Sequence, residues 1–254
     1  MLRVIITGAS SGIGAALALH YARSGAVLGL IARRKAELEQ LAGKLSTPVR
    51  IYPIDVRDAR AVQEAATDFL QRHGCPDVVI ANAGISVGTL TEFSEDLPAF
   101  RDVIDINLIG MVQTFQPFIA AMRAARGGNL VGIASVAGYR GLPGAAAYSA
   151  SKAAAVSYLE SLRVELRGSG VKAITICPGY IATPMTAQNP YPMPFILSAE
   201  AAACSIAGII SRGRTFAIIP WQMAIVARVL RVLPNWLYDR MFGRVPRKPR
   251  RSRN

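Results

Sequence analysis

Tyr148 and Lys152 lie four residues apart, and Ser135 lies thirteen residues before the tyrosine. If the segment is helical, the phenol and the ammonium share one face and are close enough to interact. Tyrosine ordinarily titrates near pH ~10, and a nearby positive charge makes its phenolate easier to form. Such a tyrosine can exchange a proton with an alcohol or carbonyl oxygen near neutral pH. The Tyr-x-x-x-Lys spacing alone is a weak signal, because it occurs by chance in many helices.

A glycine-containing turn near the N-terminus gives this pair a context. The apolar run Leu2–Ile6 leads into the turn Thr7–Gly14, and the composition of Ala15–Ala22 predicts a helix. Strand, turn and helix in this order are typical of a dinucleotide site, where the helix N-terminus faces the phosphates. Glycines there permit the tight turn, the approach of the pyrophosphate, and the packing of helix on strand. The candidate cofactor-binding residues of the turn are Gly8, Ser10, Ser11, Gly12, Ile13 and Gly14.

The second predicted strand, Ala26–Ala32, has no acidic residue at its end. An NAD site usually has Asp or Glu there, which binds the ribose 2′-hydroxyl. This chain has Arg33-Arg34-Lys35 instead, and the fork of a guanidinium suits a 2′-phosphate. We therefore predict NADP(H) as the cofactor, in preference to NAD(H), with Arg33 as the residue that binds the 2′-phosphate.

Considered together, these residues resemble the short-chain dehydrogenase/reductase family, from about Arg3 to Ile219. Each motif is modest alone, and the set in this order is specific. Two positions depart from the family pattern: Ala81 stands where many members have Asn, and Ser11 where many NADP-linked members have a basic residue. The second departure leaves Arg33 to support the NADP(H) prediction. The matching motifs are Thr7-Gly8-(x)3-Gly12-Ile13-Gly14, Asp55-Val56, Asn82-Ala83-Gly84, Asn107, Ser135, Tyr148-(x)3-Lys152 and Pro178-Gly179-(x)3-Thr183.

The resemblance implies further cofactor contacts. Asp55 and Val56 would flank the adenine, and Asn82-Ala83-Gly84 would close the nucleotide site after the fourth strand. The segment after Pro178 would line the nicotinamide and its phosphates. The additional cofactor-binding residues are Asp55, Val56, Asn82, Ala83, Gly84, Tyr148, Lys152, Pro178, Gly179, Ile181 and Thr183.

The resemblance also implies roles in the reaction. Hydride would pass between the nicotinamide and a substrate carbon, while the protein supplies orientation and proton transfer. Tyr148 would donate its proton to the substrate oxygen, and Ser135 would hydrogen-bond the same oxygen. Lys152 would lower the pKa of the tyrosine and bind the nicotinamide ribose. Asn107 would hold a water that connects Lys152 to solvent.

Alternating short apolar runs and helical stretches predict the fold. With the two strands already named, further runs give about seven parallel strands and one α/β domain of the doubly wound, Rossmann type. Pro117 lies inside a long helical stretch and predicts a kink or break there. The further strands are expected at Val49–Pro53, Val78–Ala81, Asn129–Ala134, Lys172–Cys177 and Thr215–Ile219. The helices are expected at Ala59–His73, Phe100–Ala124 and Ala147–Leu166.

Composition bounds the compartment and the cofactor class. The 254 residues contain three scattered cysteines and two histidines, which predict no metal site and suit a reducing compartment. The first strand begins almost at residue 1, so we expect no signal peptide and a cytoplasmic protein.

Two segments near the C-terminus bear on the substrate and on partners. Residues 184–198, with three prolines among apolar side chains, could be a lid over an apolar substrate or a packed connection.

Residues 1–219 form the predicted catalytic domain, and residues 220–254 form an apolar and basic helical extension with a disordered basic tail. From Arg228 onward nine basic residues face one acidic residue, which accounts for +8 of the net charge of +13. This extension could pack on its own domain, pack on a second subunit, or contact the inner face of an anionic membrane. It is too short to span a membrane, and no nucleic-acid-reading motif accompanies it.

The predicted function is an NADP(H)-dependent oxidoreductase that interconverts an apolar or lipid-like ketone or aldehyde and its alcohol. A reductase of 3-oxoacyl thioesters is the alternative within enzymes, where Arg140 could supply a basic entrance for the pantetheine arm. A non-catalytic NADP(H)-binding scaffold or sensor is the alternative outside enzymes. The resemblance also implies a homodimer or homotetramer.

Overall fold

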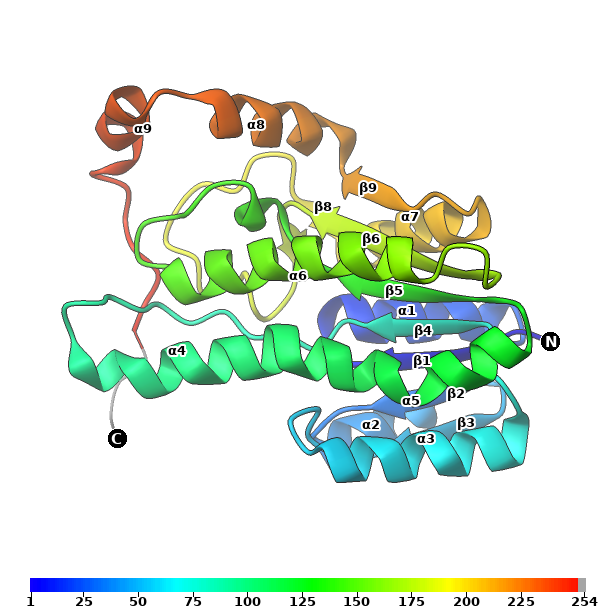
Figure 1. Ribbon diagram of the computed structural model, residues 1–254. Helices are drawn as coiled ribbons and strands as arrows, with labels where there is room; N and C mark the ends of the chain where they lie inside the picture. Colours follow the sequence, from blue (N-terminus) through cyan, green and yellow to red (C-terminus); the bar gives the residue numbers. More distant parts are fainter. Residues whose placement is uncertain (251–254) are drawn as a thin grey trace.

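A seven-stranded parallel sheet forms the centre of the molecule. It is seen in a computed structural model that describes residues 1–250 (Figure 1). The strand order is β3-β2-β1-β4-β5-β6-β9, so the direction of the connections reverses between β1 and β4. This confirms the doubly wound fold expected from the sequence. The strands are β1 (Arg3–Thr7), β2 (Val27–Ile31), β3 (Val49–Tyr52), β4 (Val78–Ala81), β5 (Gly128–Ile133), β6 (Val171–Pro178) and β9 (Phe216–Ile219).

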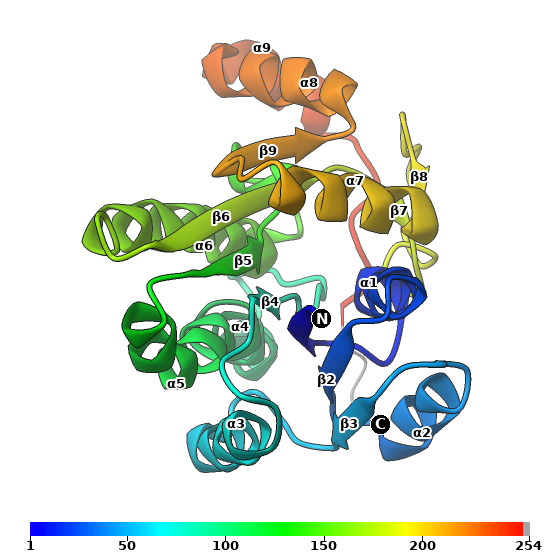
Figure 2. The ribbon, with the colours of Figure 1, turned by 90° about the vertical axis from the view of Figure 1, so that its right-hand side faces the viewer.

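Helices cover both faces of the sheet, and each face has its own hydrophobic core (Figure 2). The central strands are buried on both sides, so their sequences are mainly apolar runs rather than alternating patterns. One face carries α1 (Gly12–Arg23), α2 (Lys35–Ala42) and α7 (Ala199–Ser211). The other carries α3 (Ala59–His73), α4 (Leu97–Ile104), α5 (Gly110–Ala124) and α6 (Ala146–Glu165).

The long helical stretch around Pro117 differs from its prediction. It consists of α4, a π-helical turn at Asp105–Ile109, and α5, with a short 3-10 turn at Ser94–Asp96 before them. Of the kink or break predicted at Pro117, the break is wrong, because α5 continues through the proline, and the kink stays a prediction. Phe115 and Phe118 on either side of it are buried, and their packing holds the helix in place. The irregular turn lies earlier, where it contains Asn107.

The same stretch has the length and composition of a membrane-spanning helix. The run Ser94–Ala124 passes that test among the described residues, with 44% of its apolar window buried inside the fold. Its helices pack beside α3 and α6 on the sheet. It therefore has the surroundings of a core helix in this structure.

Two short strands enclose the proline-rich segment. β7 (Ile181–Ala182) pairs in parallel with β8 (Leu197–Ser198). The chain between them leaves the sheet and returns directly into α7. The segment predicted as a lid is therefore an excursion whose two ends lie side by side.

The C-terminal extension follows β9 and runs over the molecule toward the carboxyl ends of the strands. It comprises α8 (Trp221–Val232), α9 (Asn235–Phe242) and residues 243–250, which we call the strap (Figure 1). The strap crosses the edge where the strands end, and Gly88 forms a β-bridge with Arg250 there. We expected a disordered tail; the described part of it is packed, and residues 251–254 lie outside the described residues.

Candidate active site

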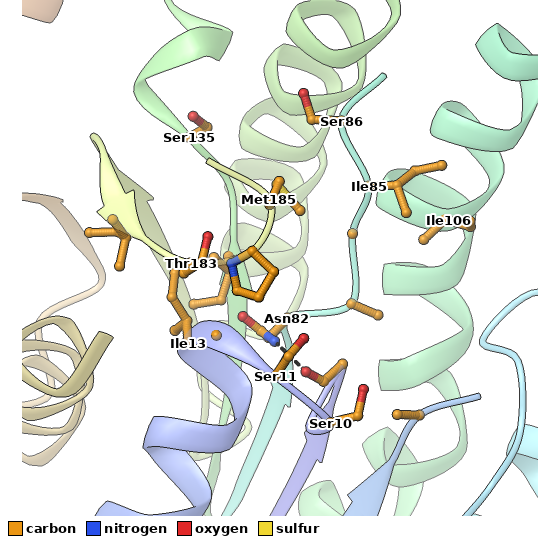
Figure 3. A pocket seen from close by; sticks show the side chains of 18 of the residues that line it. Ser10, Ser11, Ile13, Asn82, Ile85, Ser86, Ile106, Ser135, Thr183 and Met185 are labelled. Carbon is orange, nitrogen blue, oxygen red and sulfur yellow. Dashed lines mark hydrogen bonds between the residues drawn. The ribbon is translucent and has the colours of Figure 1, made fainter. Parts of the chain in front are cut away.

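A cavity of about 570 Å³ lies at the carboxyl ends of the strands, where a doubly wound sheet binds its ligands. Every site residue expected from the sequence lines it except Gly14 and Asn107. Figure 3 shows Ser10 and Ser11 toward one end and Ser135 toward the other, with Thr183 and Met185 between them. The cavity therefore connects the glycine turn to the Tyr148 region. Pro184, Met185 and Thr186 also line it, and they belong to the segment considered as a lid. The missed lining residues are Ala32, Arg34, Ile54, Ile85, Ser86, Val87, Ile106, Ile133 and Ala134.

The glycine turn is tied by hydrogen bonds to the loop after β4. The Asn82 side chain donates to the carbonyls of Thr7 and Gly8 at 3.0 and 3.2 Å, and the Thr7 hydroxyl accepts from the Asn82 and Ala83 amides. A Cβ on Gly14 would lie 2.3 Å from the Gly8 carbonyl oxygen, and Gly8 has φ +66°. These contacts leave no room for side chains, so both glycines are required by close approach of backbone.

The N-terminus of α1 opens into the cavity. Ser11 precedes the helix in an extended conformation, and its side chain does not cap the helix amides. The first amides of a helix lack partners within the helix and favour an anion. This turn therefore fits the pyrophosphate of a dinucleotide, with Gly12 next to Thr183 on the facing loop.

Arg34, rather than Arg33, turns toward the glycine turn. The guanidinium of Arg34 donates to the hydroxyls of Ser10 and Ser11, each at 2.9 Å. Arg33 lies 3.8 Å from Asp55 on the neighbouring loop, and both arginines line the cavity. The sequence singled out Arg33; a basic pair after the second strand signalled either residue, and only the side-chain directions separate them.

The Asp55-Val56 pair also lies at the nucleotide end. Arg57 donates to the Asp55 carboxylate at 2.8 Å and to Asp102 at 2.8 Å. Burial acts to raise the pKa of Asp55, and the hydrogen bonds from Arg57 outweigh it and hold that pKa below its usual value. Val56 is buried and packs against Gly110 at the start of α5.

Ser135 and Tyr148 meet at the far end of the cavity. Ser135 follows β5, where a 3-10 turn begins at Val136–Gly138, and its hydroxyl accepts from the Ala137 amide at 3.1 Å. Tyr148 lies in the first turn of α6. Burial raises the pKa of Tyr148, and the neighbouring Ser135 hydroxyl opposes that rise. In the protein without ligands the phenol is therefore protonated at neutral pH, the form that donates to an oxygen.

Lys152 is buried beneath the tyrosine. Its ammonium donates to the Ile133 carbonyl at 2.7 Å and lies 5.8 Å from the centre of the Tyr148 ring. Burial lowers the pKa of Lys152 to about 8. In this state burial dominates the pKa of the tyrosine, and the lysine does not bring it down as the sequence suggested. Within residues 1–250 the ammonium forms no ion pair, so it has donors left for a ligand in the cavity.

Asn107 lies behind the cavity, in the π-helical turn. Its side chain is fully buried, accepts from the Ile85 amide at 2.8 Å, and donates to the Ile85 carbonyl and the Ser151 hydroxyl at 3.0 Å. The Ser151 hydroxyl in turn donates to the Tyr148 carbonyl. Asn107 therefore positions both the loop after β4 and the first turn of α6. Its role in holding a water beside Lys152 stays a prediction.

The segment after β6 forms the opposite wall. The Thr183 amide donates to the Thr186 hydroxyl at 3.0 Å, which closes a turn over the cavity. A Cβ on Gly179 would lie 2.6 Å from the Met223 side chain, so α8 packs directly behind this wall. The extension thus supports residues that the sequence assigns to the nicotinamide.

Arg140 joins the extension to the loop between Ser135 and Tyr148. Its guanidinium donates to the Leu230 and Leu233 carbonyls at the end of α8 and lies 4.4 Å from the Tyr238 ring. These carbonyls have no partners within the helix, so the arginine caps α8. The Tyr238 hydroxyl donates to the carbonyl of Gly141 in the same loop. Arg140 is therefore engaged and does not offer the basic entrance considered above.

The strap contacts the segments that border the cavity and does not itself line it. The Pro249 carbonyl accepts from the Gly88 amide at 3.0 Å, and Arg250 pairs with the Asp96 carboxylate at 2.8 Å. The Arg250 guanidinium also lies 3.7 Å from the Phe93 ring. Lys248 is buried and donates to the carbonyl of Met185, a cavity residue, at 3.4 Å.

In the described chain, no group of three or more His, Cys, Asp or Glu side chains could hold a metal ion.

Comparisons with known proteins agree with this geometry. A family model described as short chain dehydrogenase matches residues 3–192. An uncharacterized oxidoreductase of Myxococcus xanthus is 40% identical over 241 residues, which cover 92% of this chain and 94% of the relative. An 11-beta-hydroxysteroid dehydrogenase-like protein of Arabidopsis thaliana is 34% identical over 251 residues, covering 94% and 81%.

A solved structure shows the same fold with a nicotinamide cofactor analogue. The alcohol dehydrogenase of the archaeon Thermococcus sibiricus, complexed with 5-hydroxy-NADP, superposes with a TM-score of 0.77 at 28% identity. The match covers 86% of this chain and 96% of that one. On the family model, the relatives and the fold together, the chain belongs to the short-chain dehydrogenase family and is an oxidoreductase that depends on a nicotinamide cofactor.

Proposed function

We propose that the protein is an NADP(H)-dependent oxidoreductase that interconverts an apolar ketone or aldehyde and the corresponding alcohol. The observation that carries this proposal is a single cavity with two chemically different ends. The N-terminus of α1 and Arg34 supply positive potential at one end. Ser135, Tyr148 and Lys152 supply proton transfer and hydrogen bonding at the other.

The side chains at the second end divide the work. The nicotinamide supplies or accepts hydride when it is bound. The Tyr148 hydroxyl donates a proton to the substrate oxygen in reduction and takes it back in oxidation. The Ser135 hydroxyl hydrogen-bonds the same oxygen and stabilises the charge that develops there. The Lys152 ammonium remains close to the phenol and favours its ionised form as charge moves, an effect that is strong in a water-poor site.

The preference for NADP(H) is supported by charge at the end of β2. No carboxylate follows that strand, and Asp55, which lies near, is already bound by Arg57. Arg34 is held over Ser10 and Ser11, where a 2′-phosphate would accept its donors and replace two neutral hydroxyls. Arg33 adds a second positive charge to the same edge of the cavity.

An apolar substrate is supported by the walls near Ser135. Ile85, Val87 and Met185 line the cavity, and few charged side chains accompany them. Residues 184–198, which we propose act as a lid, expose Phe195 and Ile196 to solvent at 50% and 44%. The Arabidopsis relative, named for a hydroxysteroid dehydrogenase, is in keeping with a large apolar alcohol or ketone.

The two alternatives have less support. A reductase of 3-oxoacyl thioesters would need a free cation for the pantetheine phosphate, and Arg140 is committed to α8 and Tyr238. A scaffold without catalysis would not need Tyr148, Lys152 and Ser135 to converge. A homodimer or homotetramer through the helical segments that carry Asn107 and Tyr148 also remains a proposal, which light scattering after gel filtration would test.

The test is cofactor titration followed by turnover. Purified protein is titrated with NADPH and NADH, and oxidation of the reduced cofactor is followed with a panel of apolar ketones and aldehydes. We expect tighter binding of NADPH and turnover with one substrate class. Equal affinity for both cofactors would contradict the NADP(H) preference. NADPH binding without turnover across the panel would favour the scaffold.

A further inference from the structure

The C-terminal extension has an apolar face that nothing in the described chain covers. Trp221, Ile225, Val229 and Val232 are spaced at one helical face of α8, with 68%, 53%, 51% and 79% of each residue exposed. On α9, Trp236 and Met241 add 70% and 54% exposure. Scattered exposed apolar residues are ordinary, but four large ones on one face of α8, with two more exposed on the next helix, indicate a binding surface.

The opposite face of the same helices is packed on the domain. Met223 and Ala227 of α8 are buried, as is Tyr238 of α9. Arg140 caps α8 and contacts Tyr238, so the two helices are fixed before any partner arrives. The exposed stripe is therefore presented by a rigid support and does not belong to a loose arm.

Exposed cations accompany the patch. They are Arg228 and Arg231 on α8, Arg240 on α9, and Arg244 and Arg247 beyond it. Within residues 221–250 the only carboxylate side chain is that of Asp239. None of the five arginines forms an ion pair with a carboxylate of the described residues. Their charge is therefore available to an external partner.

We propose that α8 and α9 form a docking face for the surface of an anionic lipid bilayer. Exposed tryptophans beside apolar and cationic side chains match the boundary between headgroups and acyl chains. A 12-residue helix is about 18 Å long, so α8 lies in the plane of such a surface and does not cross it.

The charge argues for lipid over a second copy of this chain. In a symmetric contact through this face, each arginine would meet the same set of arginines across the two-fold axis. Such a contact would bring together like charges with one carboxylate per chain to offset them. An anionic surface instead attracts each cation by about 1 kcal/mol, which corresponds to roughly fivefold in affinity per arginine. This proposal does not depend on the proposed reaction, because it uses no cavity residue.

The chain supplies its own probe. Its two tryptophans, Trp221 on α8 and Trp236 on α9, are both exposed, so tryptophan fluorescence reports on the two helices of the proposed docking face. Purified full-length protein is mixed with vesicles of phosphatidylcholine containing phosphatidylglycerol, or of phosphatidylcholine alone. We expect a blue shift and cosedimentation with the anionic vesicles, weakened by high salt. No shift and no cosedimentation with anionic vesicles would overturn the proposal.

Two charge-reversed variants distinguish binding through α8 from nonspecific attraction of a basic protein to an anionic membrane. Arg228→Glu with Arg231→Glu keeps both tryptophans. Lys44→Glu with Arg123→Glu makes the same change in net charge just after α2 and on α5, two helices that lie away from α8 (Figure 1). We expect the first variant to bind anionic vesicles at least about tenfold more weakly and the control to bind nearly as the wild type. Unchanged NADPH affinity shows that both variants are folded. Equal weakening in the two variants would overturn the assignment to α8.

The same experiment also tests whether this face binds a second copy of the chain. If protein concentration alone, without lipid, shifts the tryptophan emission to the blue together with dimer formation, the face is a subunit interface and the proposal is wrong. A shift that requires anionic vesicles supports it.

Discussion

The two ends of the cavity are built by different kinds of contact. At the nucleotide end, main-chain groups form most of the contacts: the Gly8 carbonyl leaves no room for a Cβ on Gly14, and the Asn82 side chain donates to the Thr7 and Gly8 carbonyls. At the substrate end, side chains from distant segments such as Val87, Tyr148 and Met185 form the wall, and the Arg140 and Arg250 contacts hold the segments around it. The first construction fixes one ligand shape, whereas the second can change one side chain at a time. The difference is in keeping with a shared cofactor and a varied substrate.

Tyr148→Phe tests whether the two ends are separable, and it has the largest expected effect. Loss of a positioned acid–base group should lower kcat by about 10²–10⁴-fold. The affinity for NADPH should be unchanged, because the phosphate site lies at the other end of the cavity. Stopped-flow turnover and a fluorescence titration give the two quantities. Retained turnover would contradict the assigned chemistry, and lost NADPH affinity would contradict the separation.

Lys152→Met tests the buried charge at the substrate end. In the folded protein the pKa of Lys152 is lowered to about 8, while the unfolded chain keeps the ordinary value of 10.5. The unfolded chain therefore binds more protons between these values, and this group makes the cofactor-free protein more stable as pH rises from 8 to 10.5. Below pH 8 the buried charge costs on the order of 3 kcal/mol.

The measurement is urea unfolding of cofactor-free wild type and Lys152→Met at pH 7 and near pH 10. The wild type should gain stability relative to the variant on going to the higher pH, by an amount approaching that cost. Lys44→Met, at an exposed lysine, serves as the control and should run parallel to the wild type. A difference between wild type and Lys152→Met that does not change with pH would show that Lys152 is not strained by burial.

Arg34→Asp and Arg33→Asp compare the two arginines at the nucleotide end. Charge-assisted hydrogen bonds contribute about 1.5–3 kcal/mol, so we expect Arg34→Asp to reduce the preference for NADPH over NADH by roughly ten- to hundredfold. Arg33→Asp should reduce it less, because Arg33 already pairs with Asp55. Dissociation constants for both cofactors decide the matter. A larger effect of Arg33→Asp than of Arg34→Asp would mean that Arg33, the residue predicted from the sequence, binds the 2′-phosphate.

Arg250→Ala and Asp96→Asn address the strap, with the smallest expected effect. The Arg250–Asp96 contact is partly exposed to solvent on the arginine side, so each single change should raise the substrate KM by roughly two- to fivefold. The double variant should add little, because both changes break one contact. NADPH affinity should stay at the wild-type value. Additive effects of the two substitutions on KM would show that Arg250 and Asp96 do not act through their mutual contact.

The sequence predicted most of the fold because backbone constraints leave local signals. The runs at Val78–Ala81 and Ala59–His73 have the boundaries that were expected, and the other strands differ by one or two residues. Buried parallel strands need continuous apolar runs, and a pyrophosphate turn needs glycine at fixed places. Both requirements are visible in a single chain.

The parts that were missed depend on contacts between distant residues. The π-helical turn around Asn107 has no local signal, and the expected break at Pro117 did not take into account the packing of Phe115 and Phe118. The basic tail had the composition of a solvated segment, yet Arg250 pairs with a carboxylate 154 residues away. The roles of the candidate residues in binding and catalysis remain predictions, and the structure shows which of them can act together.

The path of the strap has a practical consequence for anyone who purifies this protein. Arg250 is four residues from the C-terminus and lies beside the loops that border the cavity. The N-terminus lies at the opposite side of the sheet, where the strands begin (Figure 1). An affinity tag fused to the C-terminus would therefore be attached within four residues of these loops, whereas a tag on Met1 would be attached at the other end of the strands. Assays should use the N-terminal tag.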